Sequence, residues 1–131
     1  MMKKILIVDD NEPFRKQLAY YLFNEGFKIL NANDGVEGIQ IALQHKPDVI
    51  ISDILMPRLD GYDFLRSLKQ IKATQNIPFI FVTVNNQLED IRKSMLLGAD
   101  DYLVKPVNIN ILMQSIRMAM KKHNPVSKSF V

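Results

Sequence analysis

Five short, mostly apolar runs, separated by longer segments of helical periodicity, constrain the fold of this chain most strongly. The runs are Lys4 to Val8, Phe27 to Ala32, Val49 to Ile51, Phe79 to Val82 and Asp101 to Val104. Strands that alternate with helices form a parallel sheet covered by helices on both faces. The sequence therefore predicts an α/β fold with a single five-stranded parallel sheet flanked by five helices.

The segments between the runs carry start and stop signals of helices. The expected helices run from the Asn11 cap to Gly26, from Asp34-Gly35 to Lys46-Pro47, from Asp60-Gly61 onward, over about Gln87 to Leu97, and over about Asn108 to His123. Helical spacing predicts an inward-facing stripe in each of the five helices. In chain order, the stripes are Phe14, Leu18, Tyr21 and Leu22; Val36, Ile39 and Leu43; Phe64, Leu65, Leu68 and Ile71; Leu88, Ile91 and Met95; and Ile109, Leu112, Met113, Ile116 and Met120. The two histidines, His45 and His123, flank helix ends and are expected to face solvent.

Composition narrows the class of protein. The 131 residues are 47% hydrophobic and contain no cysteine, which excludes disulfides, thiolate metal sites and cysteine nucleophiles. No apolar run is long enough for a membrane span or a signal peptide, so we expect a soluble, cytoplasmic protein that does not engage a membrane. We expect one domain over residues 3–123 and a flexible tail or the start of a linker over residues 124–131.

The net charge of +3 is spread along the chain, and several lysines and arginines fall on the expected solvent faces of helices. This distribution does not form a basic patch, so we expect no direct nucleic-acid binding by this chain.

Polar residues follow four of the five predicted strands at the point where each strand ends. They are Asp9, Asp10, Asp53, Thr83 and Lys105. Singly, each has an ordinary explanation, such as a helix cap, a loop acid, a strand residue or a solvated lysine. With the flavodoxin-like strand order 2-1-3-4-5, however, the carboxyl ends of these strands are neighbours at one edge of the sheet, where α/β proteins bind ligands. We therefore expect the five side chains to converge on one pocket.

Three carboxylates in one pocket repel each other unless a cation neutralises them. Mg²⁺ prefers oxygen ligands and commonly binds through one or two carboxylates together with phosphate oxygens. Asp10 and Asp53 are the expected direct ligands, with Asp9 placed to hold a bound water. Lys105 and the hydroxyl of Thr83 could stabilise a phosphoryl group transferred to the carboxylate of Asp53.

The chain also resembles the receiver domains of two-component response regulators, from about Lys3 to Lys122. The motifs that carry this resemblance are Ile5 to Asp10 (ILIVDD), Asp53 to Pro57 (DILMP), Asp60 to Tyr62 (DGY) and Gly98 to Pro106 (GADDYLVKP). The resemblance implies that Asp53 accepts a phosphoryl group from a phosphohistidine on a sensor histidine kinase or a phosphotransfer protein. It also implies that Mg²⁺, or Mn²⁺, is held by Asp10, Asp53 and the backbone carbonyl of Leu55, with help from Asp9.

The resemblance implies roles for the other strand ends as well. Thr83, the backbone amide of Val84 and Lys105 would contact the phosphoryl group, and the peptide before Pro106 would be cis. Thr83 would move toward the new phosphate and Tyr102 would turn inward behind it. The change would alter the face formed by the fourth helix, fifth strand and fifth helix, through which a downstream target, an output domain or a second copy would bind.

The chain departs from the commonest receiver pattern after Thr83, where Val84 replaces a smaller Ala or Gly. A β-branched side chain beside the phosphate should narrow access for a donor or for hydrolytic water. Leu55 and Asn85 flank the same approach, and the apolar Leu55 cannot orient a water. We therefore expect slow phosphoryl transfer and a long-lived acyl phosphate.

Three other classes of protein share part of this pattern. A haloacid-dehalogenase-like phosphatase needs a second acid two residues after its nucleophile, where this chain has Leu55. A flavodoxin-type redox carrier needs a phosphate-binding loop where this chain has Asp9 and Asp10. The remaining alternative is a receiver-like module that binds proteins without phosphorylation. We expect no enzyme activity beyond phosphoryl acceptance and slow autodephosphorylation.

Overall fold

The computed structural model describes residues 2–123, so the tail or linker expected at 124–131 lies outside the described residues, as does Met1. The elements are β1 (Lys4–Val8), α1 (Glu12–Asn24), β2 (Lys28–Ala32), α2 (Gly35–His45), β3 (Val49–Ser52), α3 (Gly61–Gln70), β4 (Phe79–Thr83), α4 (Leu88–Leu96), β5 (Asp101–Val104) and α5 (Ile109–Lys122). This alternation of strands and helices confirms the predicted fold class.

The strands form one sheet in the order β2-β1-β3-β4-β5, and every neighbouring pair is parallel. Val8, at the end of β1, is in register with Ala32 on one side and with Ser52 on the other. Thr83 at the end of β4 is in register with Val104 of β5. The predicted strand order is confirmed, and the carboxyl ends of β1, β3, β4 and β5 all meet at one edge.

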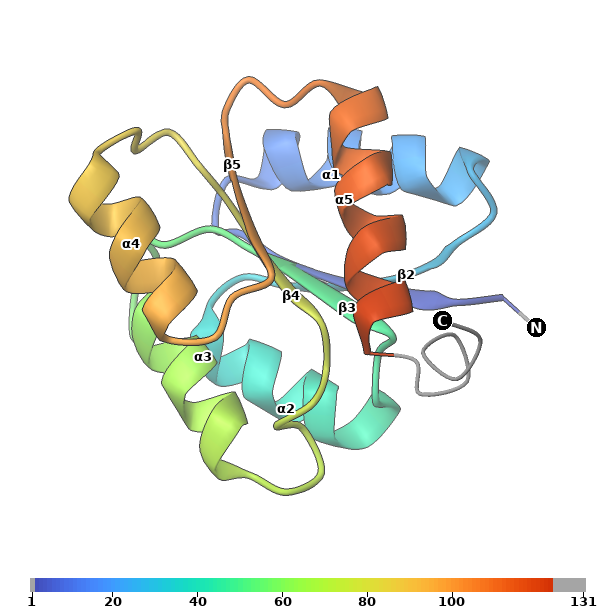
Figure 1. The fold of residues 1–131 in the computed structure, drawn as a ribbon. Coiled ribbons are helices and arrows are strands. Elements are labelled where there is room, and N and C mark those ends of the chain that lie inside the picture. Colours follow the sequence, from blue (N-terminus) through green and yellow to red (C-terminus); the bar gives the residue numbers. More distant parts are fainter. Residues whose placement is uncertain (1, 124–131) are drawn as a thin grey trace.

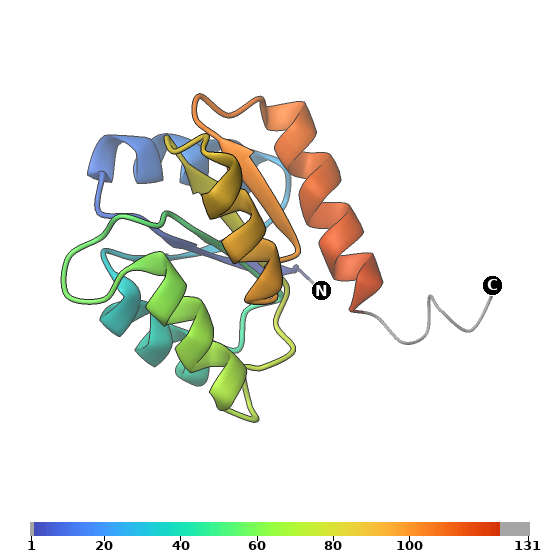
Figure 2. The same ribbon diagram turned by 60° about the vertical axis from the view of Figure 1, so that its left-hand side comes forward.

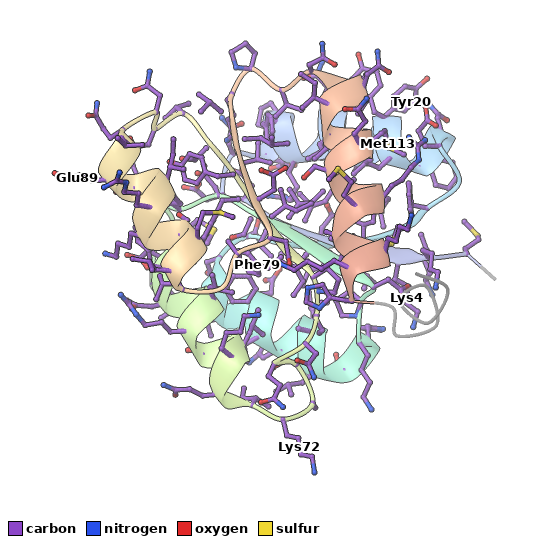
Figure 3. The ribbon with its side chains drawn as sticks, in the orientation of Figure 1. Lys4, Tyr20, Lys72, Phe79, Glu89 and Met113 are labelled. Carbon is purple, nitrogen blue, oxygen red and sulfur yellow. The ribbon has the colours of Figure 1, made fainter. Side chains whose placement is uncertain are left out.

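Helices cover both faces of this sheet, as Figure 1 shows, with α1 and α5 on one side and α2, α3 and α4 on the other. Alternate residues of each strand point to opposite faces. Leu6 and Val8 pack into the core under α2, α3 and α4, whereas Ile5 and Ile7 pack into the core under α1 and α5. In Figure 3, Phe79 lies at the centre of the molecule, while Tyr20 and Glu89 project outward from α1 and α4.

Three of the predicted inward stripes are wrong in part. On α1, Tyr21 is 45% exposed. Leu43 on α2 is 41% exposed, because this helix packs through Gly38 and Ala42, and a Cβ at Gly38 would lie 2.8 Å from the ring of Phe64. On α4, Leu88 is 63% exposed and Met95 is 45% exposed. Helix α4 buries Ser94 instead, and Ile91 and Leu97 are only partly buried.

The expectation that both histidines face solvent holds for His45 and is wrong for His123. Nε2 of His123 lies 2.8 Å from Oδ1 of Asp100, and the His123 side chain is only 21% exposed. The other carboxylate oxygen of Asp100 accepts a hydrogen bond from the amide of Phe79 at 2.9 Å. Asp100 therefore ties the end of α5 to the beginning of β4, at the sheet edge opposite the strand-end acids.

Within residues 2–123, no helix combines the length and the apolar character that a membrane crossing requires.

Candidate functional site

The acid that organises the site is Asp53, which directly follows β3. Its amide donates to the carbonyl of Val8 at 2.9 Å, which continues the pairing of β3 with β1 beyond the last strand residue. Its Oδ1 accepts a hydrogen bond from the amide of Ile54 at 2.7 Å. The Asp53 side chain is 12% exposed, so the backbone holds it in place while one edge stays accessible.

The structure brings Asp9 and Asp10 to Asp53. One carboxylate oxygen from each of the three residues lies within 4.8 Å of the other two. Asp9 is almost fully buried, at 2% side-chain exposure, whereas Asp10 is exposed. Hard oxygen donors at this spacing fit a divalent cation such as Mg²⁺, which holds several waters beside one or two carboxylates.

Lys105 reaches this cluster from β5, across the end of β4. Its Nζ donates to Oδ2 of Asp9 at 2.9 Å and to Oδ2 of Asp53 at 3.2 Å, and the side chain is 12% exposed. Burial acts to lower the pKa of Lys105, but the hydrogen bond and the charges of the two acids outweigh burial and raise this pKa above its ordinary value. Lys105 is therefore held as an ammonium ion between two carboxylates.

The environment of Asp9 in this cluster disfavours the charged form of its carboxylate. Burial raises the pKa of Asp9 above its ordinary value, even though Lys105 and the amide of Asn11 both donate hydrogen bonds to its carboxylate. A raised pKa means that the charged form of Asp9 is less stable here than in water. The single positive charge of Lys105 does not neutralise the negative charges of the three carboxylates at this edge. This excess of negative charge favours the binding of an added cation.

The sharp turn after Asp53 depends on Gly61. The amide of Gly61 donates to the carbonyl of Ile54 at 2.7 Å, which brings the start of α3 against the site. A Cβ at residue 61 would lie 2.8 Å from Cα of Ile54 and would also overlap the carbonyl of Asp53. Only glycine permits this approach, so the DGY motif shapes the loop that carries the acid.

Thr83 and Lys105 end adjacent strands and are joined through the backbone. Thr83 is fully buried, and its carbonyl accepts a hydrogen bond from the amide of Lys105 at 2.8 Å. The next residue, Val84, is 67% exposed, and Leu55 is 68% exposed. The Lys105–Pro106 peptide bond is cis, as predicted for Pro106.

Tyr102 lies inward, with 9% exposure, and its hydroxyl donates to the carbonyl of Asn85 at 2.7 Å. The side chain of Asn85 donates to Oδ2 of Asp90 at 2.7 Å, and the hydroxyl of Tyr62 donates to Oδ1 of Asp90 at 2.8 Å. This network joins α3, α4, β5 and the loop after Thr83. Sequence reasoning missed Tyr62 and Asp90, since nothing in their spacing shows that two helices bring them together.

Residues 5–117 match the family model of the response regulator receiver domain. The chain belongs to this family. Receiver domains bind Mg²⁺ at an acidic pocket and interact with histidine kinases or phosphotransfer proteins, and the three acids of this chain supply such a pocket.

Individual relatives agree with this assignment. Protein PilH of Pseudomonas aeruginosa is 39% identical over 119 residues, which are 91% of this chain and 98% of PilH. The probable transcriptional regulator ycf29 of Pyropia yezoensis is 38% identical over 116 residues, or 88% of this chain and 52% of that protein. The structure of the chemotaxis response regulator CheY4 of Vibrio cholerae has a TM-score of 0.84 at 29% identity and covers 91% of this receiver domain and 99% of that chain.

The lengths of the relatives fall into two groups. This receiver chain spans about half the length of ycf29 and of several other transcriptional regulators that it matches, but nearly all of PilH.

The Tyr62–Asp90 contact yields a prediction about alkaline stability. Burial and the adjacent Asp90 carboxylate raise the pKa of Tyr62 above the ordinary value of 10.0. A phenol whose pKa is raised by folding contributes stability below the ordinary pKa and loses it as pH rises toward the raised value. Tyr62→Phe removes the hydrogen bond to Asp90 and should lower the free energy of unfolding by about 1.5 kcal/mol at pH 7. The decline of this free energy above pH 10 should be flatter in the variant, because phenylalanine does not titrate.

Urea unfolding at a series of pH values from 7 to 11 measures both effects. Tyr20→Phe is the matched control, since Tyr20 is 65% exposed and its loss should change neither quantity. Equal alkaline slopes in the wild type and in Tyr62→Phe would contradict the role given to this contact.

Proposed function

We propose that this protein is a phosphorylation-dependent signalling switch of a two-component system and that Asp53 is the phosphoryl acceptor. The observation that carries the proposal is the position of Lys105, whose ammonium group contacts both Asp9 and Asp53. A buried ammonium beside one oxygen of a partly exposed carboxylate is suited to stabilise charge on a group that becomes attached there. The donor is a phosphohistidine on a sensor histidine kinase or a phosphotransfer protein in the cytoplasm.

In the transfer step, an oxygen of the Asp53 carboxylate bonds to phosphorus while the phosphorus–nitrogen bond of the donor breaks. The electron pair of that bond goes to the imidazole nitrogen, and the imidazole takes up a proton from solvent. Lys105 exchanges its contact with Asp53 for a phosphoryl oxygen. We expect the hydroxyl of Thr83 and the amide of Val84 to donate to the others, because β4 pairs with β3, the strand that Asp53 follows.

Asp10, Asp53 and the carbonyl of Leu55 would hold Mg²⁺ or Mn²⁺, with Asp9 orienting a water. When bound, the metal offsets negative charge on the phosphoryl oxygens. Such a cation would also offset the burial that opposes the charged form of Asp9.

The signal passes through Thr83 and Tyr102 to the face of α4, β5 and α5, which Figure 2 shows with the two helices on either side of β5. The hydroxyl of Tyr102 donates a hydrogen bond to the carbonyl of Asn85, in the loop after Thr83. A movement of Thr83 would therefore shift the carbonyl that Tyr102 contacts. Exposed apolar side chains lie on these elements: Leu88, Met95, Leu96, Val104, Ile111 and Met118. A downstream target, an output domain or a second copy of the chain would bind this face.

Intact mass spectrometry after incubation with acetyl phosphate and Mg²⁺ tests the acceptor. We expect the wild type to gain one phosphoryl group, and we expect no gain after chelation of the metal or in Asp53→Asn. Asp60→Asn is the control, because Asp60 caps α3 through the amide of Asp63 and lies outside the acid cluster. An unmodified wild type, offered a phosphorylated kinase as well, would favour a module that binds partners without phosphorylation.

Val84 generates a second prediction. Its side chain is 67% exposed next to Thr83, on the open side of the site, where a donor or a water must approach. Val84→Ala should gain the phosphoryl group faster and lose it faster, each by about twofold or more, because the approach is wider.

The measurement is the decay of the phosphorylated mass after removal of the donor. Val36→Ala, which changes a partly buried valine at the start of α2, should decay at the wild-type rate. Equal decay of wild type and Val84→Ala would show that Val84 does not limit access.

A further inference from the structure

Lys105 has a third contact, which neither the metal site nor the acid pair accounts for. Its Nζ lies 4.0 Å from the centroid of the Phe14 ring. An ammonium ion over an aromatic face is attracted by the negative charge density of the ring, more strongly where water is excluded. Because the Lys105 side chain is only 12% exposed, little water competes with the ring.

The ring of Phe14 is fixed by the way α1 begins. Asn11 is the N-cap, and its side chain accepts a hydrogen bond from the amide of Phe14 at 3.1 Å. Phe14 itself is partly buried against the core under α1 and α5. The helix cap and the core packing together fix the position of the ring relative to the ammonium group.

Phe14 and Lys105 both line a hollow of about 550 Å³, together with Leu18, Tyr21, Val84 and Ile109 among others. Without the ring, the flexible lysine side chain would have more room to turn into this hollow and away from Asp53. The remaining contacts of the ammonium group would then be those to Asp9 and Asp53.

We propose that Phe14 is a positioning residue for phosphoryl acceptance, because its ring holds the Lys105 ammonium group toward Asp53 by a cation–π contact. This inference rests on the proposed function, since Lys105 must meet the transferred phosphoryl group. The ring touches neither the acceptor nor the donor in this scheme and acts only through the lysine. An apolar residue of similar size would fill the same space without attracting the ammonium group.

The test is a graded series at residue 14, in which site-specific incorporation replaces phenylalanine by its 4-fluoro, 3,5-difluoro and pentafluoro derivatives. Fluorine withdraws charge from the ring face with little change in shape. The rate of Mg²⁺-dependent phosphorylation by acetyl phosphate should fall stepwise, by about two- to thirtyfold at the pentafluoro derivative. Phe14→Leu should match the slow end of the series, and Phe14→Tyr should keep nearly the full rate.

A second measurement reads the contact itself. The ε-methylene protons of Lys105, observed by NMR, should show a ring-current shift that disappears in Phe14→Leu and persists in Phe14→Tyr. Circular dichroism and Mg²⁺ affinity should be unchanged across the fluorinated series, because fold and acid cluster are intact.

The outcomes separate this inference from the proposed function. A wild type that accepts no phosphoryl group would overturn both. A wild type that is phosphorylated normally, with a rate that does not change across the fluorinated series, would overturn only the role of Phe14. A Phe14→Leu variant that is folded and phosphorylated at the wild-type rate would overturn it as well.

Discussion

The functional edge of the sheet depends on the two ion pairs of Lys105. They join the end of β5 to the ends of β1 and β3, with contacts of 2.9 Å to Asp9 and 3.2 Å to Asp53. Two acids and a lysine with 2% to 12% side-chain exposure are stable together only if their charges are paired. Truncating the lysine would leave two buried carboxylates facing each other, so the residues of this edge have to be considered as one unit.

That unit exists because of the topology of the sheet. The order β2-β1-β3-β4-β5 places β1 and β3 side by side, so that Asp9 and Asp53 follow neighbouring strands. Lys105 starts two strands away from β3 and crosses the end of β4, a distance that a long side chain can cover. The amide of Lys105 donates to the carbonyl of Thr83, so the lysine and the hydroxyl are joined through the backbones of adjacent strands.

The sequence predicts this edge well because parallel topology determines it: once the strands are assigned, their carboxyl ends must meet. Contacts that depend on the exact packing of helices are a different matter. The periodicity of α4 predicts Leu88 and Met95 as inward residues, yet this helix covers only the margin of the sheet and buries Ser94. No spacing rule could show that Tyr62 and Asn85 share the carboxylate of Asp90, or that Phe14 lies beneath Lys105.

In the proposed function, Asp53, rather than another acid of the same edge, carries the phosphoryl group. Reduction of the phosphorylated protein with borohydride converts an aspartyl phosphate to homoserine, and tandem mass spectrometry of peptides then locates the changed residue. We expect homoserine at position 53 after treatment with phosphodonor and Mg²⁺, and aspartate at positions 9 and 10. Homoserine at either of those two positions, with position 53 unchanged, would contradict the assignment of Asp53 as the acceptor.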